Sequence, residues 1–306
     1  MRLVLDARTA AFAALIDYAG LFPPASLDMD DAVVAYRRAL ASPQSWVAGR
    51  FLCRASQLTD LAASATASLV AGDQPWEIGV IFDLPPGESA ALATDFHAEM
   101  DPVMTVAVAE ARLDEPTAVR VGALLDAILA IAPDVVPFVE VDRSASLRDQ
   151  VELITDGLEQ RHRVGGAKIR CGGVSPDLVP TPGEVAEFIM AATTRSLPFK
   201  ATAGLHQPIR HFDEELGVER HGFVNLLMAS TFAASGMDRA VLEAVIAEVD
   251  PDAFAISTAF ASWRDHEVPG SALRRTRQSG FVSYGSCDFD EPVEALRALG
   301  FIGEGS

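Results

Sequence analysis

The sequence has few cysteines, and their spacing does not suggest a structural role. Its three cysteines, Cys53, Cys171 and Cys287, are far apart, and no C-x-x-C pair occurs. Neither a disulfide framework nor a structural zinc site is therefore indicated. Cys53 lies in an apolar run and is expected to fill the core. Cys287, in Gly-Ser-Cys-Asp, has no basic neighbour in the sequence that would support a reactive thiolate.

Basic residues and long apolar runs are also scarce. The chain has 24 Lys and Arg against 43 Asp and Glu, a formal net charge of −19, and no basic cluster stands out. A polyanion would be repelled at long range, so nucleic acid is not expected as a partner. The longest uncharged stretch, Gly222 to Met237, is shorter than the ~20 residues of a membrane-spanning helix. Charged residues Asp6, Arg8 and Asp17 interrupt any signal peptide, so we expect a cytoplasmic protein with no membrane partner.

The chain does contain a repeated pattern of strands and helices. Six short apolar runs, rich in β-branched or aromatic residues, start 27 to 32 residues apart: Trp46 to Cys53, Trp76 to Phe82, Val103 to Ala109, Val135 to Val141, Gly165 to Arg170 and Leu197 to Thr202. Each gap holds a helical pattern, the clearest of which opens with the capping box Thr181-Pro-Gly-Glu184. Repeated βα units predict a parallel sheet.

Two further units bring the number of strands to eight. Ala13 to Ile16 can supply the first strand, and Phe281 to Tyr284 the eighth, although Ala253 to Ser257 is a competitor for the eighth. No G-x-G-x-x-G turn or P-loop motif supports a doubly wound sheet. We therefore expect a single (β/α)8-barrel domain over residues 1–306, with about 207–280 as an inserted or irregular segment between strands seven and eight.

Charged residues occur inside two of the expected strands, where burial on both sides requires a reason for them. In Ala167-Lys168-Ile169-Arg170, alternation points Lys168 and Arg170 into the barrel. The same alternation in Phe199-Lys200-Ala201-Thr202 points Lys200 inward. Two ammonium groups on adjacent strands repel each other in a poorly hydrated interior, so one lysine should have a lowered pKa. A neutral lysine is a nucleophile toward carbonyl groups.

Carboxylates that could complete such a site lie near the C-terminal ends of the strands, where barrel active sites are built. They are Asp83, Glu110, Glu140 and Asp142. An alternative is that these acids only neutralise the interior cations in an ion-pair network, since buried lysines are paired more often than they are catalytic.

Two patches of the chain resemble a known family. The segments Ala167-Lys168-Ile-Arg-Cys-Gly-Gly, Thr181-Pro-Gly-Glu184-Val185 and Pro198-Phe-Lys200-Ala-Thr-Ala-Gly204-Leu resemble the sixth and seventh strands of the deoxyribose-phosphate aldolase group of class I aldolases. The segment Leu15-Ile16-Asp17-Tyr18-Ala-Gly-Leu is similar to that group's first strand, with tyrosine where histidine is usual. The middle of the chain agrees in the order of its elements but not in motifs.

The resemblance implies that Lys168 forms a Schiff base with the substrate carbonyl and that Lys200 lowers the pKa of Lys168. The proton-handling acid should come from strand four, where the family has aspartate and position makes Glu110 our candidate. The loops depart from the family, whose glycine-rich turns bind a sugar phosphate, because this chain continues His206-Gln-Pro-Ile-Arg210-His211 after strand seven. A phosphate site that includes Ser286 and a site for an unphosphorylated ligand both stay open.

Histidines after strand seven offer a different chemistry. His206, His211 and His221, together with Glu140 or Asp142, could ligate a divalent metal at the barrel mouth. Their spacing matches no strong metal motif, and they could equally be loop histidines or contact a substrate. This set defines an alternative function, a metal-dependent hydrolase or isomerase that uses His206, His211 and a strand-five acid.

The sequence as a whole predicts a lyase of class I aldolase type, with Lys168, Lys200 and Glu110 as catalytic residues and a small-molecule carbonyl substrate as partner. Neither metal nor organic cofactor is required, because the lysine itself supplies the electron sink. A homo-oligomer is left open. A barrel that only binds a small molecule, with both lysines locked in salt bridges, is a further alternative. The candidate substrate-binding residues are Asp17, Glu140, Asp142, Arg170, Thr202, His206 and Ser286.

Overall fold

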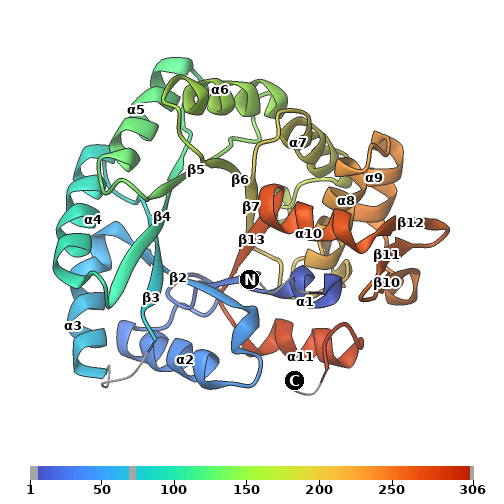
Figure 1. Ribbon diagram of the computed structural model, residues 1–306, viewed down its shortest axis with the longest axis horizontal. Helices are drawn as coiled ribbons and strands as arrows, with labels where there is room; N and C mark the ends of the chain where they lie inside the picture. Colours follow the sequence, from blue (N-terminus) through green and yellow to red (C-terminus); the bar gives the residue numbers. More distant parts are fainter. Residues whose placement is uncertain (1–5, 69–73, 304–306) are drawn as a thin grey trace.

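The computed structural model describes residues 6–68 and 74–303, which form a closed barrel of parallel strands surrounded by helices (Figure 1). The strands follow the order β1-β13-β7-β6-β5-β4-β3-β2 around the barrel. They are β1 (Ile16–Tyr18), β2 (Ala48–Arg54), β3 (Trp76–Ile81), β4 (Met104–Arg112), β5 (Val136–Glu140), β6 (Gly166–Arg170), β7 (Phe199–Thr202) and β13 (Phe281–Ser286). The predicted (β/α)8 fold is confirmed.

Helices connect successive strands and cover the outside of the barrel. They are α2 (Met29–Ala41), α3 (Leu58–Ser68), α4 (Pro86–Met100), α5 (Ala118–Leu129), α6 (Leu147–Gln160) and α7 (Pro182–Thr194), with α11 (Asp290–Ala298) after β13. The capping box at Thr181 is present, since its side chain accepts from the Glu184 backbone and the Glu184 carboxylate accepts from the Thr181 backbone. Local sequence signals and the barrel topology therefore agree.

Two strands extend past their predicted limits and include buried acids. The first strand, expected at Ala13 to Ile16, is Ile16–Tyr18, so Asp17 lies within it. The fourth runs to Arg112 and includes Glu110, which was expected to follow the strand. Both carboxylates face lysines inside the barrel, and this pairing permits an acid at a position where sequence alternation alone suggests the end of a strand.

The segment between β7 and β13 is regular rather than irregular. It contains the hairpin β8 (His211–Asp213) and β9 (Val218–Arg220), helices α8 (Phe223–Ala234), α9 (Arg239–Ala247) and α10 (Gly270–Ser279), and an antiparallel sheet of β10 (Phe254–Ile256), β11 (Phe260–Trp263) and β12 (His266–Pro269). Helix α8 packs between α7 and α10 and contacts β13, so it belongs to the helical layer. The competitor for the eighth strand, Ala253 to Ser257, is β10 of the separate sheet, and Phe281 begins the true eighth strand.

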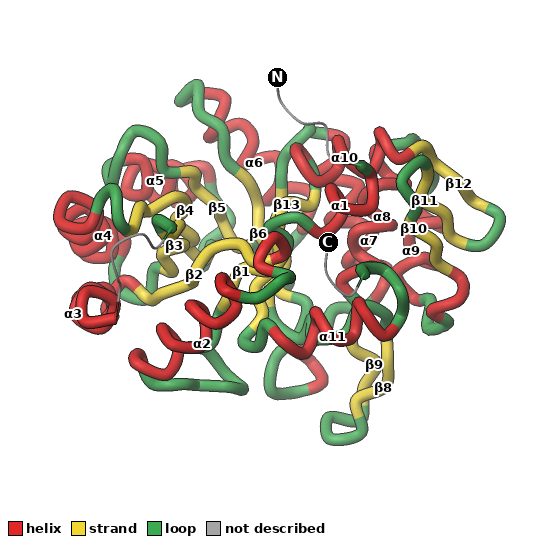
Figure 2. Tube along the Cα trace, turned by 60° about the horizontal axis from the view of Figure 1, so that its bottom comes forward, coloured by secondary structure: helices red, strands yellow, loops and turns green. Residues whose placement is uncertain are grey.

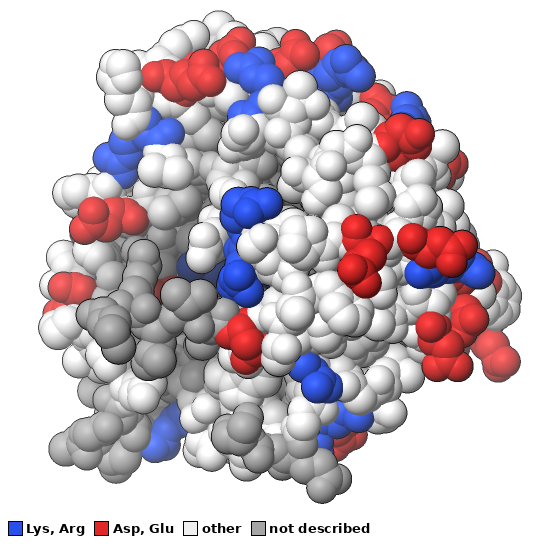
Figure 3. All heavy atoms as spheres, turned by 45° about the vertical axis from the view of Figure 1, so that its right-hand side comes forward, with Lys and Arg blue, Asp and Glu red and all other residues white. Residues whose placement is uncertain are grey.

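The two ends of the barrel carry different segments. The β8–β9 hairpin follows β7 and therefore marks the C-terminal end of the strands, whereas α1 (Ala7–Phe12) leads into β1 and lies on the opposite side (Figure 2). Acidic and basic side chains are interspersed on the face shown in Figure 3, and this part of the described surface shows no extended basic patch.

Candidate active site

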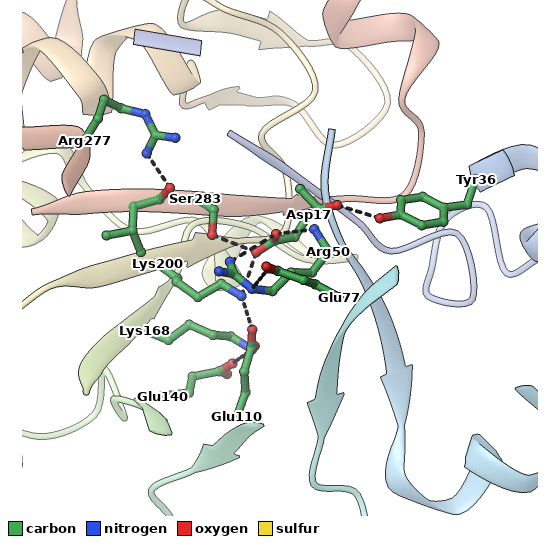
Figure 4. A network of polar contacts seen from close by, with 12 residues as sticks. Asp17, Tyr36, Arg50, Glu77, Glu110, Glu140, Lys168, Lys200, Arg277 and Ser283 are labelled. Atoms are coloured by element: carbon green, nitrogen blue, oxygen red, sulfur yellow. Dashed lines mark hydrogen bonds and ion pairs between the residues drawn. The ribbon is translucent and has the colours of Figure 1, made fainter. Parts of the chain in front are cut away.

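Two lysines lie inside the barrel on neighbouring strands. Lys168 on β6 and Lys200 on β7 are direct partners in the register of the sheet. Their side chains are only 7% and 1% exposed, and both point inward toward a group of acids (Figure 4). The inward direction predicted from strand alternation is confirmed for both. Arg170, two residues after Lys168, is 45% exposed and reaches the Glu140 carboxylate at 3.3 Å.

Three buried carboxylates surround the two ammonium groups. Glu110 bridges the lysines: its Oε2 lies 2.7 Å from Lys168 Nζ, and its Oε1 accepts a hydrogen bond from Lys200 Nζ. Glu140 Oε2 lies 2.8 Å from Lys168 Nζ on the side away from Lys200, and Asp17 Oδ2 lies 2.7 Å from Lys200 Nζ. Each amine is thus held by two carboxylates, and Glu110 is common to both.

The Asp17 carboxylate is fixed by its surroundings on β1, β2 and β13. The Arg50 backbone N–H donates to Oδ1 at 2.8 Å, and the Ser283 hydroxyl donates to Oδ2 at 2.7 Å. A Cβ atom at Gly49 would come within 2.4 Å of Asp17 Oδ1, so the close approach of β2 requires glycine there. The first-strand acid is therefore an integral part of the network.

The electrostatics correct one sequence-based expectation. Burial alone would lower the pKa of Lys168, but the adjacent Glu110 and Glu140 carboxylates outweigh burial and raise that pKa above its usual value. Burial likewise opposes ionisation of Glu110, Glu140 and Asp17, and the neighbouring cations overcome it and lower the pKa of each carboxyl. The predicted lowering of the Lys168 pKa by Lys200 is wrong, because Glu110 stands between the two amines and neutralises their repulsion.

Sequence reasoning missed one plain signal about these lysines. The complete chain contains only two lysines, Lys168 and Lys200, and the remaining 22 of its 24 basic residues are arginines. Both lysines are buried in the barrel, so the described surface carries arginine but no exposed lysine. Ser283 was also missed, since a serine in an apolar strand gives no sign of the partner it will meet on β1.

Thr202 lies in a position to contribute to the same site. It is the last residue of β7 and follows Lys200 by two residues, so it faces the same side of that strand. It pairs with both Arg170 and Gly285, which places all three one level nearer the C-terminal end of the barrel than the lysines.

The structure does not bring Asp142 or Ser286 into the lysine network. The Asp142 carboxylate, in the turn after β5, accepts from the backbone and hydroxyl of Ser144. Ser286 shares its face of β13 with Tyr284, whose ring stacks on Phe223 of the outer helix α8 at 4.9 Å. Ser286 Oγ is buried and has no hydrogen-bond partner among the described residues. These two predicted substrate contacts therefore have no support from the geometry.

The predicted histidine and acid set is not assembled. His206 Nδ1 lies 3.1 Å from Glu291, His211 Nδ1 lies 3.2 Å from the Ile209 carbonyl, and His221 Nε2 lies 2.7 Å from the Pro180 carbonyl. Within residues 6–68 and 74–303, no group of three or more His, Cys, Asp or Glu side chains is arranged to hold a metal ion. The metal-dependent alternative, which needs His206, His211 and a strand-five acid together, lacks the required arrangement.

Comparisons with known proteins assign no family to the chain. No protein-family model matches the chain, and a search of curated proteins finds no significant match. In the described part of the chain, no helix combines the length and apolar character needed to cross a membrane.

Proposed function

We propose that the protein is a lyase of class I aldolase type in which the amine of Lys168 forms a Schiff base with a small carbonyl substrate. The observation that carries this proposal is the bridging of Lys168 and Lys200 by the single carboxylate of Glu110. A carboxylate within hydrogen-bond distance can take the proton from an ammonium group and release the nucleophilic amine. The same carboxylate can later move protons on the substrate.

The surroundings favour Lys168 over Lys200 as the nucleophile. Lys168 is the more exposed of the two, and Arg170 and Thr202 lie nearer the barrel mouth on the same two strands. Lys200 is enclosed by Asp17 and Glu110, and its Nζ lies 5.5 Å from the centre of the Phe138 ring. Lys200 is suited to remain a fixed cation that holds Glu110 in place.

The carboxylates around Lys168 stabilise a cationic intermediate more than they stabilise the neutral amine. A proton first passes from Lys168 to Glu110 or Glu140, and the neutral amine then attacks the carbonyl carbon. The carbinolamine loses water and becomes an iminium ion, whose positive charge lies where the ammonium charge lay. Glu110 and Glu140 therefore stabilise the iminium ion electrostatically, although they also raise the pKa of the resting amine.

Carbon–carbon cleavage follows from the same arrangement. A carboxylate takes the proton of the substrate's β-hydroxyl group, the bond between the α- and β-carbons breaks, and its electron pair moves toward the iminium nitrogen. The products of this step are an aldehyde or ketone and an enamine on Lys168. Protonation of the enamine at carbon and hydrolysis of the resulting imine by water restore the lysine.

The choice of lysine supports amine chemistry over simple ion pairing. Arginine forms buried ion pairs with carboxylates in bidentate geometry and does not lose its proton in proteins, whereas lysine can become a neutral nucleophile. In a chain whose other basic residues are all arginine, the two lysines occur where the carboxylates converge.

A second candidate is a barrel that binds a small molecule without reacting with it. The observation in its favour is that both amines are held by carboxylates, as in a purely structural network. Such a barrel would bind a carbonyl compound reversibly and form no imine. Chemical trapping of the imine therefore distinguishes the two functions.

The experiment is reduction with borohydride in the presence of acetaldehyde, acetone or hydroxyacetone, followed by peptide mapping. We expect a reduced adduct on the Lys168 peptide that disappears in Lys168→Arg, which keeps the charge but cannot form an imine. The primary amines other than Lys168 are Lys200 and the α-amino group of the chain. The α-amino group is the internal control for reagent quality. Labelling of the α-amino group without labelling of Lys168 would contradict the proposal.

A further inference from the structure

A second cluster of reactive side chains lies at the C-terminal end of the barrel. Cys287 directly follows β13, His206 lies in the loop after β7, and Glu291 lies in the first turn of α11. Cys287 Sγ is 3.7 Å from His206 Nε2, and His206 Nδ1 is 3.1 Å from Glu291 Oε2. Gln207 Nε2 donates to the other Glu291 oxygen at 2.9 Å and fixes the carboxylate. Three separate segments thus bring together a thiol, an imidazole and an acid.

The hydrogen bonds determine what the imidazole can do. Glu291 accepts from Nδ1–H, so the neutral ring keeps its lone pair on Nε2, the nitrogen that faces the Cys287 thiol. Contact with Cys287 and the nearby Glu291 charge raise the pKa of His206, against the opposing effect of burial. The imidazole is therefore oriented as a base toward the thiol. The three groups follow the order nucleophile, base and orienting acid, as in enzymes with a catalytic thiol.

The other two cysteines lack this environment. Cys53 and Cys171 are fully buried, and burial raises the pKa of both thiols, to about 12 for Cys171. The Cys53 thiol donates to the backbone carbonyl of Arg54 at 3.4 Å and is otherwise part of the hydrophobic core. Cys287 retains 8% exposure beside a partly exposed histidine. The chain thus supplies two matched internal controls for the reactivity of Cys287.

We infer that Cys287 is a nucleophile toward activated acyl compounds, with His206 as its base and Glu291 as a positioning residue. The Cys287 proton moves to His206 Nε2, and the sulfur attacks the acyl carbon of an ester or thioester. The bond from that carbon to the leaving oxygen or sulfur breaks, and the leaving group takes the proton from His206. A thioester on Cys287 results, which water hydrolyses with His206 again as the base.

Charge near the cluster indicates which acyl compounds are favoured. A surface depression of about 510 Å³ adjoins Glu291 and is lined by Gln207, Asp288, Asp290, Glu291, Glu294, Ala295 and Ala298. Its four carboxylates attract a cationic compound and repel an anionic one. Arg38 pairs with Asp290 at 3.3 Å and offsets one of these charges. The site therefore favours cationic or neutral acyl compounds.

The test uses the whole protein and p-nitrophenyl acetate as the acyl donor. We expect a burst of one p-nitrophenolate per chain and a hydroxylamine-sensitive acetyl group on the Cys287 peptide. His206→Gln should slow acetylation at pH 7 by about 10²-fold or more, the usual size of a general-base effect. Cys53→Ala should acetylate like the original protein, because Cys53 lies outside the cluster.

A second reagent and a charge comparison separate catalysis from simple exposure of the thiol. Modification of Cys287 by iodoacetamide at pH 7 should be slower in His206→Gln than in the original protein, because the base that takes the thiol proton is then absent. Acetylthiocholine, a cationic thioester, should acetylate Cys287 faster than the anionic S-acetyl-mercaptoacetate.

Some outcomes would overturn the inference. Equal acetylation rates in His206→Gln and the original protein would do so, as would acetylation at another residue or the reverse charge preference. Thermal unfolding of the same variants shows whether each protein is folded, and this control does not depend on the chemistry proposed for Lys168.

Discussion

Replacing Lys200 with methionine should destabilise the protein strongly, because it removes the cation shared by two buried carboxylates. Lys200 pairs with Asp17 and Glu110, whose side chains are 0% and 2% exposed. Removing one partner of a buried ion pair costs about 3–5 kcal/mol, since the remaining charge is left uncompensated. With an unfolding entropy of about 2.1 cal/mol/K per residue, this loss lowers Tm by roughly 5–8 °C for a chain of this length.

The loss should depend on pH in a defined direction. In the original protein the pKa values of Asp17 and Glu110 are lowered, so their contribution to stability is present above the unfolded values near 4 and is lost as pH falls through the folded values. In Lys200→Met, one carboxylate has a raised folded pKa, and its penalty disappears as acid protonates it. The stability difference should therefore be largest near pH 7 and smallest near pH 4.

The assay is urea and thermal unfolding of Lys200→Met at pH 4, 5.5 and 7, alongside Arg195→Met as the control. Arg195 makes a partly exposed ion pair with Asp156 at 2.6 Å, and breaking such a pair should cost less than about 1 kcal/mol. The same variant should also shift Lys168 labelling toward alkaline pH, because Glu110 is then left to Lys168 alone. Equal, small losses in both variants, or a loss that grows toward pH 4, would refute the reasoning.

Three further predictions concern other buried polar groups. Glu110→Gln should still form an adduct at Lys168 but lower aldol turnover by about 10²–10⁴-fold, measured as product formation, because its proton-transfer group is gone; unchanged turnover would exclude Glu110 from that role. Burial lowers the pKa of His221 to about 4, so the folded protein should lose stability as pH falls from about 6.5 to 4, and urea unfolding of His221→Gln should show a smaller loss over that range. Tyr284→Phe should leave the free energy of unfolding unchanged or raise it, because the Tyr284 hydroxyl is buried with no partner among the described residues; a loss above about 1 kcal/mol would point to a partner such as buried water.

The barrel could be predicted from the sequence because its signals are local and repeated. Apolar runs every 27 to 32 residues, with helix starts such as the capping box at Thr181, specify βα units independently of distant contacts. The limits of β1 and β4 could not be predicted, because Asp17 and Glu110 are tolerated in strands only through lysines on β6 and β7. The three-stranded sheet around β10 was missed for a different reason, since its short strands carry too few residues for alternation to show.

The inward direction of the two lysines was predictable from the sequence, but the electrostatics around them were not. Strand alternation correctly pointed Lys168 and Lys200 inward. Which acid stands between them depends on the register of four strands, and this reverses the expected direction of the Lys168 pKa shift. The Cys287 cluster was invisible for the same physical reason, because its base lies 81 residues away along the chain and reaches the thiol only through the packing of β7 beside β13.

The most direct test of a Schiff base at Lys168 uses NMR of protein labelled with ¹³C at the lysine Cε position. Because the chain has two lysines, the spectrum should contain two resonances, which Lys168→Arg assigns. A ketone with cyanoborohydride should convert the Lys168 resonance to that of a secondary amine and leave the Lys200 resonance in place. No change in either resonance, or conversion of Lys200 alone, would contradict the account.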